Sequence, residues 1–409
     1  MPDLTKGKKK MGKNWEEIAE KIIKKERAVV ERNRGKIPYT AKNHVFDDRS
    51  DKKDICWWTN GFYGGTLWQL YNATKDELFK DCAKELEDKL DAVFMDYNGM
   101  DHDAGFRWLP TSVANYRLFK TKESKNRALL AAANLAGRFN MNGNFIRAWN
   151  DWGDDRDTTG WAIIDCMMNL PLLYWASEEL GDPRFKAIAV AHADTAMKNF
   201  IRKDGSVRHV VGFNPTTGEF DRDYGGQGYG EGSSWTRGQT WALYGFTLSY
   251  IHTGDRKYLE TAIKVADRFA ERIPKDGLIP VDFDQPDEPR YIDSTAAAIA
   301  SCGFITLAKV LTEGKLGDCN TAIGCESQSG KCMSAADVAA LSDKYMAAAE
   351  KMLSALDELD CDYDPEHDEL LTRCSASYHD KDHEFPIIYG DYYYIEAIWK
   401  LTGRELFIW

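Results

Sequence analysis

Ile164-Asp165-Cys166-Met167-Met168-Asn169 opens a long apolar run and places a carboxylate inside an otherwise hydrophobic stretch. Five further motifs of aromatic, small and acidic or hydroxyl residues open apolar runs in the same way: Trp58-Thr59-Asn60-Gly61-Phe62, His102-Asp103-Ala104-Gly105-Phe106, Ser234-Trp235-Thr236-Arg237-Gly238-Gln239, Asp293-Ser294-Thr295-Ala296 and Gly390-Asp391-Tyr392-Tyr393. A unit that recurs in this way predicts helices that begin on one common rim. Because consecutive units are usually neighbours in space, Asp103 and Asp165 are the first candidates for a facing pair of carboxylates.

Amphipathic helical patterns fill the sequence between these motifs, beginning with residues 15–30. Pairs of helical patterns joined by short turns follow: 67–71 with 78–93, 170–180 with 184–200, and 243–251 with 257–272. Such pairs can stack as an open solenoid or close into a ring. Polar and aromatic residues at one end of alternate helices favour the ring, because a ring gathers them around its mouth. We therefore predict an all-α, single-domain toroid of helical hairpins.

No linker divides the 409 residues after the first dozen, so residues 15–409 are predicted to form one domain behind a mobile, lysine-rich tail at 1–14. A polar stretch at 314–334 interrupts the helical pattern and carries Cys319, Cys325 and Cys332. No Cys-x-x-Cys pair favours zinc there, so a loop insertion is the main interpretation, with a metal knuckle or local disulfide left open. The cysteines in apolar surroundings are expected to be buried and reduced.

The charge balance, 53 basic against 65 acidic residues, argues against a nucleic-acid or anionic-membrane partner. A small anionic substrate remains compatible with it, because one or two donors such as Arg237 or His209 suffice to bind a carboxylate. We expect no apolar run of the roughly 18 residues that a membrane span needs. The chain is expected to be cytoplasmic, or periplasmic if a leader has been removed.

The chemistry depends on the two aspartates. Asp103 can simply cap a helix, and Asp165 can be a buried, hydrogen-bonded cap. However, apolar neighbours on both sides of Asp165 predict desolvation, which raises the pKa of a carboxyl group toward that of a proton donor at neutral pH. Asp293 and Asp391 are interpreted as helix caps. A protonated carboxyl group beside a second carboxylate can cleave a glycosidic linkage or protonate an electron-rich carbon.

A glycine-rich segment at 214–234 is predicted to wrap across the mouth of the ring, where His209, Gln227 and Arg237 can meet a ligand. Arg237 stands at a predicted helix start and can bind an anion there, or pair with a neighbour such as Glu231. Sugar-stacking candidates are Trp57, Trp58, Trp149, Trp152, Trp235 and Trp241. Motifs for serine hydrolases, phosphate-binding loops, zinc proteases and dinucleotide binding are missing, so no metal and no cofactor is predicted.

At these residues the chain resembles the unsaturated glucuronyl hydrolases, glycoside hydrolase family 88, from about residue 15 to the C-terminus. The motifs that carry the resemblance are 58–62, 102–106, 164–175, 234–241 and 390–394. It implies an (α/α)6 toroid that removes a 4,5-unsaturated uronic acid from the non-reducing end of oligosaccharides made by polysaccharide lyases. It also implies that Asp165 is the general acid and base, and that Asp103 assists at the sugar ring.

In the reaction that the resemblance implies, a proton adds to C4, water adds to C5, and the hemiketal opens to release the remaining sugar. Residues that match the family's substrate-contacting positions are His102, His209, Gln227, Trp235, Arg237, Trp241 and Trp57 or Trp58. The insertion at 314–334 departs from the family pattern. Alternatives are an unsaturated rhamnogalacturonyl hydrolase, an N-acylglucosamine-type epimerase that uses His102 and His209, and a silent oligosaccharide-binding protein. The aglycone sugar, its sulfation and the oligomeric state are left open.

Overall fold

The computed structural model describes residues 13–151, 153, 156–313 and 334–409. Most of the predicted tail and insertion, with Cys319, Cys325 and Cys332, and also Trp152, lie outside the described residues. Two residues assigned to the tail belong to the fold, because the Asn14 side chain caps the first helix and Lys13 Nζ lies 2.6 Å from Asp357 Oδ2.

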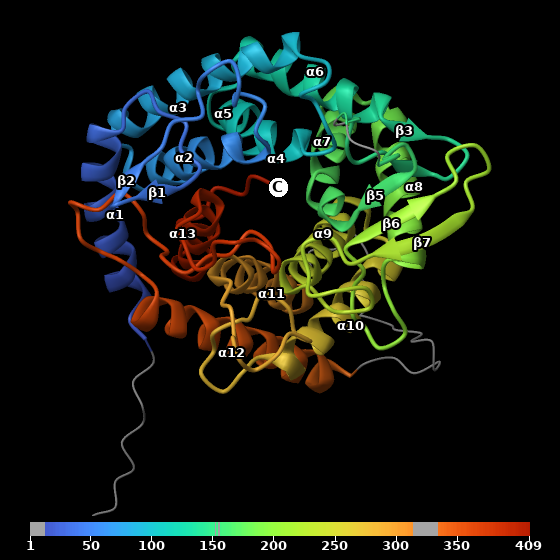
Figure 1. Ribbon diagram of the computed structural model, residues 1–409. Helices are drawn as coiled ribbons and strands as arrows, with labels where there is room; N and C mark the ends of the chain where they lie inside the picture. The colour runs from blue at the N-terminus through green and yellow to red at the C-terminus, as the bar shows by residue number, and fades with distance from the viewer. Residues whose placement is uncertain (1–12, 152, 154–155, 314–333) are drawn as a thin grey trace, which may run out of the picture.

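The helices form two concentric rings (Figure 1). The inner helices are α2 (Phe62–Thr74), α4 (Ala104–Trp108) with its continuation α5 (Ala114–Phe119), α7 (Leu170–Leu180), α9 (Thr236–Thr253), α11 (Ser294–Glu313) and α13 (Ile388–Thr402). Their outer partners, in the same order, are α3 (Glu77–Lys89), α6 (Lys122–Gly137), α8 (Arg184–Asn199), α10 (Arg256–Arg272), α12 (Ala335–Leu359) and α1 (Trp15–Arg32). This arrangement confirms the predicted (α/α)6 toroid.

The sequence explains which helices lie inside. α9 is buried on every side from Thr236 to Tyr250, whereas α10 buries one apolar stripe that includes Val265 and Phe269. The hairpin turns also follow local signals, because Asp255 caps α10 and Gly254 ends α9 in the left-handed conformation, at φ 72°. The first turn is shorter than predicted, since α2 continues to Thr74 and only two residues separate it from α3.

The second inner helix is interrupted, a feature that was not predicted from the sequence. A π-helical turn, η3 (Leu109–Val113), separates α4 from α5 and contains Pro110. Proline has no N–H to donate, so it disturbs the regular hydrogen-bond ladder. The Thr111 hydroxyl restores one contact by donating to the Arg107 carbonyl at 2.6 Å.

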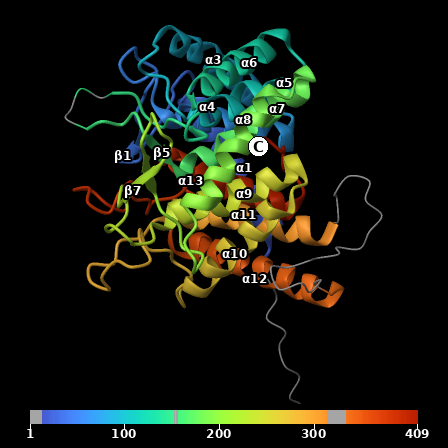
Figure 2. The same ribbon diagram turned by 90° about the vertical axis from the view of Figure 1, so that its right-hand side faces the viewer.

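Short strands gather at one end of the ring, as the side view of Figure 2 shows. β5 (Trp161–Ile163), β6 (Val210–Phe213) and β7 (Phe220–Tyr224) form an antiparallel sheet, while β1 (Ala41–Lys42) pairs with β2 (Val45–Phe46) and β3 (Phe139–Asn140) with β4 (Phe145–Ile146). The sheet brings the end of β5, just before Asp165, beside the start of β6, just after His209.

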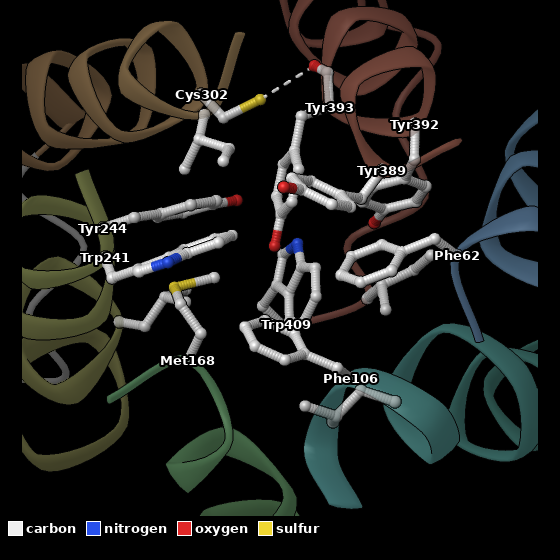
Figure 3. Close-up of a cluster of buried hydrophobic side chains, with 14 of the residues drawn as sticks. Phe62, Phe106, Met168, Trp241, Tyr244, Cys302, Tyr389, Tyr392, Tyr393 and Trp409 are labelled. Carbon is white, nitrogen blue, oxygen red and sulfur yellow. Dashed lines mark hydrogen bonds between the residues drawn. The ribbon is translucent and has the colours of Figure 1, made fainter. Parts of the chain in front are cut away.

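An aromatic cluster fills the axis of the ring (Figure 3). Trp409 lies at its centre, wholly buried, with its ring parallel to Tyr393 at 5.8 Å between centroids. The Trp409 indole N–H donates to Glu396 Oε2 at 2.8 Å, so its polar atom is satisfied inside the core. Phe106 and Trp241 pack against the same cluster.

One part of α11, Ser294–Thr312, is long and apolar enough to cross a membrane, and no other described helix meets that test. The expectation that no apolar run reaches this length was therefore wrong. The segment is an inner helix between α9 and α13, and 83% of an 18-residue stretch of it is buried inside the fold. Its composition is explained by its place in the core.

Candidate active site

All six sequence motifs lie at the N-terminal ends of inner helices. Each inner helix is followed or preceded by an outer helix that runs back, so the six inner helices point in the same direction. Their N-terminal ends form one rim, which confirms the prediction from the repeated motifs. Short 3-10 turns precede two of these helices: η1 (Trp58–Gly61) leads into α2, and η4 (Ile164–Met168) leads toward α7.

Asp165 lies in η4 among buried Ile164, Cys166 and Met167. Its side chain is 15% exposed, and its Oδ1 finds no hydrogen-bond partner among the described residues. Burial raises the pKa of Asp165 to about 7, although the charge of Arg237 opposes the shift. The desolvated carboxyl group that the apolar sequence predicted is therefore present, and it can hold a proton at neutral pH.

Asp103 stands immediately before α4, but its side chain makes no capping hydrogen bond, so the cap interpretation does not describe it. Asp103 Oδ1 accepts a hydrogen bond from Asn169 Nδ2 at 3.2 Å, and Oδ2 lies 3.5 Å from His102 Nε2. Burial and the nearby charges of Asp101 and Asp165 raise the pKa of Asp103 well above its ordinary value. The two aspartates thus influence each other's ionisation, as expected for a pair.

Asn169 joins the segments of the two aspartates, although no role was predicted for it from the sequence. Its Nδ2 donates to Asp103 Oδ1 and to the Asp165 carbonyl, both at 3.2 Å, while its Oδ1 accepts from Phe106 N at 2.8 Å. Gly105 allows this contact, because a Cβ there would lie 2.5 Å from Asn169 Cα. The available signal was the spacing, since Asn169 follows Asp165 by one helical turn.

Two buried histidines flank the pair. Burial lowers the pKa of His102 to about 4 and that of His209 to about 3, so both rings are neutral at ordinary pH. His209 Nδ1 accepts from Gln227 N at 2.9 Å, which puts the ring proton on Nε2. That Nε2 lies 3.9 Å from Asp165 Oδ1. The N–H therefore faces the space next to the Asp165 carboxyl group.

Arg237 is 1% exposed and occupied by protein partners, instead of standing open at the rim as expected. Its Nη1 lies 2.5 Å from Asp293 Oδ2 and donates to the Ser375 carbonyl at 2.6 Å, and its Nη2 donates to the Ala376 carbonyl. The pairing with a surface residue such as Glu231 is not the one observed. Arg237 influences the site through its charge, which favours ionisation of Asp165.

Gln227, in the glycine-rich segment, and Trp235, directly after that segment, support His209. Gln227 Nε2 donates to the Ala376 carbonyl at 2.8 Å, which ties this segment to the chain before α13. Gly226 has a φ of 56°, and a Cβ there would lie 2.0 Å from His209 Nδ1, so only glycine fits. The Trp235 ring lies 4.1 Å from the His209 ring and 4.6 Å from the guanidinium of Arg237.

The tryptophans predicted to contact a ligand differ in accessibility. Trp58 is half-buried and lies 4.9 Å from the Tyr389 ring, whereas Trp57 is 37% exposed next to Tyr39. Trp241 is 0% exposed and packs against Phe106 in the axial cluster, so its contact with substrate stays a prediction. Its position six residues into α9 explains the difference.

The cap interpretation is right for one of the remaining aspartates. Asp293 Oδ1 accepts from Thr295 N at 3.2 Å in the first turn of α11, and its Oδ2 pairs with Arg237. Asp391 lies inside α13 and accepts from Leu370 N and Leu371 N at 3.2 and 2.7 Å, so it is not a cap. It secures the preceding segment to the last inner helix.

One group among the described residues has the composition of a metal site: His44, Asp362 and His367, with candidate ligand atoms within 4.8 Å of one another. The two histidine rings stack in parallel at 3.6 Å, and their Nδ1 atoms contact Glu369 and Asp362 at 2.6 Å each. Because the two rings are parallel, their nitrogen lone pairs do not converge on one point. A metal ion could bind both histidines only if the rings turned. This cluster makes no contact with Asp103 or Asp165.

A closed ring of helical hairpins with two buried carboxyl groups at its rim has the equipment of a glycan-processing enzyme of the helical-toroid class. The model of Glycosyl Hydrolase Family 88 matches residues 19–321. The chain therefore belongs to glycosyl hydrolase family 88, and it is a glycosidase.

Two curated relatives agree with this membership. The chain is 35% identical over 378 residues to the unsaturated glucuronyl hydrolase of Bacillus sp. (strain GL1), covering 90% of this chain and 91% of that protein. It is 34% identical to the unsaturated chondroitin disaccharide hydrolase of Streptococcus pyogenes serotype M1, over 83% and 80% of the two chains.

Solved structures show the same fold. The unsaturated glucuronyl hydrolase of Bacillus sp. GL1 aligns with a TM-score of 0.81 and 31% identity, over 95% of this chain and 96% of that one. An unsaturated glucuronyl hydrolase described as specific for heparin aligns with a TM-score of 0.79 and 28% identity, over 96% and 98%.

Proposed function

We propose that this enzyme removes a 4,5-unsaturated uronic acid from the non-reducing end of oligosaccharides by hydrating the C4=C5 double bond. Support comes from relatives named as unsaturated glucuronyl and unsaturated chondroitin disaccharide hydrolases. The observation that carries the proposal is the Asp165 carboxyl group on the rim of the ring. Burial raises its pKa to about 7, so that it can hold a proton at neutral pH. Hydration of a vinyl ether requires such an acid at neutral pH.

In the proposed mechanism Asp165 donates its proton to C4, and the electrons of the double bond form the new C–H bond. The positive charge that develops at C5 is shared with the ring oxygen. Water then attacks C5 and returns a proton to the Asp165 carboxylate, which restores the acid. The product is a hemiketal at C5, which opens and releases the aglycone without attack at the anomeric carbon.

The surrounding residues have proposed roles that fit their geometry. The His209 Nε2–H faces the space beside Asp165 and can donate to the substrate, and Asp103 is placed to accept from a sugar hydroxyl. Buried Arg237 supplies positive charge that favours binding of the uronate carboxylate. Further contacts are assigned to His102, Gln227, Trp235 and the half-buried face of Trp58, with Trp57 further out on the rim.

The epimerase alternative depends on His102 or His209 as a base that removes a proton from carbon. Burial lowers the pKa of both histidines to about 4 and about 3, which makes them weak bases. Their environment therefore favours the hydratase-type reaction over epimerisation. A pectin-derived substrate differs only in its aglycone, so it is treated below as an outcome of the substrate panel.

The test follows the ultraviolet absorbance of the conjugated enol-ether carboxylate on lyase-generated disaccharides from chondroitin, hyaluronan, heparin, gellan, ulvan and pectin. Loss of absorbance is expected on at least one, and the ranking of rates identifies the aglycone class. A flat trace across the panel with folded enzyme would refute the function.

Asp165→Asn tests the catalytic assignment, because it keeps the shape of the side chain while removing the proton donor. We expect turnover to fall by at least about 100-fold with little loss of substrate binding. The matched control is Asp391→Asn, a second buried rim aspartate whose pKa burial also raises to about 7 but which bonds only backbone N–H groups of the preceding segment. Equal activity of the two variants would contradict the assignment.

A further inference from the structure

Asn169 holds a fixed orientation between the two aspartates. It is fully buried, and its Oδ1 accepts from Phe106 N at 2.8 Å. Because a backbone N–H must meet the amide oxygen, the amide nitrogen has to face the other way. That nitrogen donates to Asp103 Oδ1 and to the Asp165 carbonyl, each at 3.2 Å. The amide thus couples the position of the Asp165 backbone to the Asp103 carboxyl group.

The two carboxyl groups differ in the hydrogen bonds that they receive. Asp103 receives the Asn169 N–H, and a hydrogen bond to a carboxylate stabilises its ionised form. Asp165 Oδ1 is buried without a hydrogen-bond partner among the described residues, and the nearest histidine N–H is 3.9 Å away. An unbonded buried oxygen is less costly on a neutral carboxyl group than on a charged one.

Burial raises the pKa of both carboxyl groups, and the charges around them favour an ionised Asp165, because Asp101 raises the pKa of Asp103 and Arg237 lowers that of Asp165. Titratable groups facing Asp103 are Asp101, His102, Arg107, Asp165 and Cys166, and those facing Asp165 are Asp103, Cys166, His209, Arg237 and Tyr393. Arg107 Nη2 lies 2.8 Å from Asp101, and Arg237 Nη1 lies 2.5 Å from Asp293, so each cation has its own anion. The Asn169 amide opposes these charges, because it donates to the carboxyl group of Asp103 but only to the backbone carbonyl of Asp165.

We infer that Asn169 is a positioning residue that places the negative charge of the pair on Asp103 and leaves the proton on Asp165. The inference rests on the proposed function, because it explains how Asp165 keeps the proton that C4 receives. It predicts two separate limbs in the pH profile of kcat/KM. The acidic limb reports protonation of Asp103, and the alkaline limb reports loss of the proton from Asp165.

The test compares the pH profile of wild type with Asn169→Ala and with Asn169→Leu, which keeps the side-chain volume if alanine impairs folding. The acidic limb is expected to move up by about one to two pH units, the effect of losing a hydrogen bond to a charged group. The alkaline limb reports the change from the singly ionised pair to the fully ionised pair. It is expected to stay in place, because Asp103 is ionised in both states and both therefore lose the same hydrogen bond from Asn169. An unmoved acidic limb, or a raised alkaline limb, would overturn the inference.

Asn60→Ala is the matched control. Asn60 is also a fully buried asparagine at the start of an inner helix, but its amide donates only to the carbonyls of Asp54 and Ile55, at 3.0 and 2.9 Å. This variant is expected to be less stable, while both limbs of its pH profile stay at the same pH as in wild type. If Asn60→Ala moved the acidic limb as far as Asn169→Ala does, the shift would reflect loosened packing, and the specific role of Asn169 would be rejected.

A measurement without turnover separates this inference from the proposed function. Titration of the aspartate carboxyl carbons by ¹³C NMR, with Asp103→Asn and Asp165→Asn as assignment variants, follows the pair directly. In wild type the Asp103 carbon is expected to titrate before that of Asp165, and in Asn169→Ala the order is lost or reversed. The opposite order in wild type would overturn the inference, even in an enzyme that hydrates every substrate of the panel.

Discussion

Arg237→Ala tests whether this arginine is a structural and electrostatic element or a direct ligand of the substrate. The guanidinium joins three parts of the rim: its own helix α9, Asp293 and Thr295 at the start of α11, and the carbonyls of Ser375 and Ala376 before α13. The variant leaves Asp293 charged, 0% exposed and without its cation. Removing one partner of a buried ion pair typically lowers the free energy of unfolding by about 3–5 kcal/mol, and that is the expected loss.

Urea denaturation followed by tryptophan fluorescence measures this loss, with kcat and KM determined on the same samples. The double variant Arg237→Met, Asp293→Asn removes both charges and is expected to recover much of the stability, although not the activity. Since the charge of Arg237 lowers the pKa of Asp165, the alkaline limb of the pH profile should also move to higher pH. An Arg237→Ala enzyme as stable as wild type, altered only in KM, would refute this account and restore direct substrate binding.

Three further predictions concern the same ring. With a pKa of about 7 for Asp165, kcat/KM should fall about tenfold per pH unit above that value, and a flat profile from pH 6 to 9 would contradict the assignment of the acid. Burial raises the pKa of Glu26 from 4.5 to about 8, so the folded state holds this proton more tightly, and the free energy of unfolding should decrease as pH rises from about 4.5 to 8. Glu26→Gln should remove that decrease, about 4–5 kcal/mol at most, in urea titrations at pH 5 and pH 9. Gly105→Ala would press a Cβ against Asn169, and we expect at least about a tenfold loss of kcat at 25 °C, whereas full activity would show that the two segments can separate freely.

The sequence predicted those features that depend on local pattern. The six helix starts, the amphipathic outer helices and the desolvated setting of Asp165 each follow from neighbours within a few residues, and the structure confirms them. The interruption of the second inner helix at Pro110 was missed, although proline is a visible signal, because the surrounding residues gave no clear helical period. Asp391 was predicted to cap the last inner helix, but that helix begins earlier, at Ile388. Helix ends are the least certain part of such a prediction.

Features that depend on distant residues were not accessible in this way. Arg237 and Asp293 are 56 positions apart and meet only because their helices are neighbours in the ring. Asn169 bonds Asp103 from 66 positions away, and nothing in either motif shows that contact. Trp241 follows the rim motif at 234–239 by only two residues, yet the turn of α9 directs it into the axis. The sequence therefore supplied candidates for the site, while their partners required the fold.

The ring closes between opposite ends of the described chain. Five hairpins join helices that are adjacent in sequence, whereas the sixth pairs α1 with α13, and Arg404 bonds Glu16 across 388 positions at 2.7 Å. Local hairpins form quickly, but a contact of this separation carries a large loop-closure entropy. Folding is therefore expected to proceed hairpin by hairpin, with closure of the ring as the slow step. Until that step the apolar flanks of the first and last inner helices remain uncovered, which makes the open ring the species most prone to aggregate.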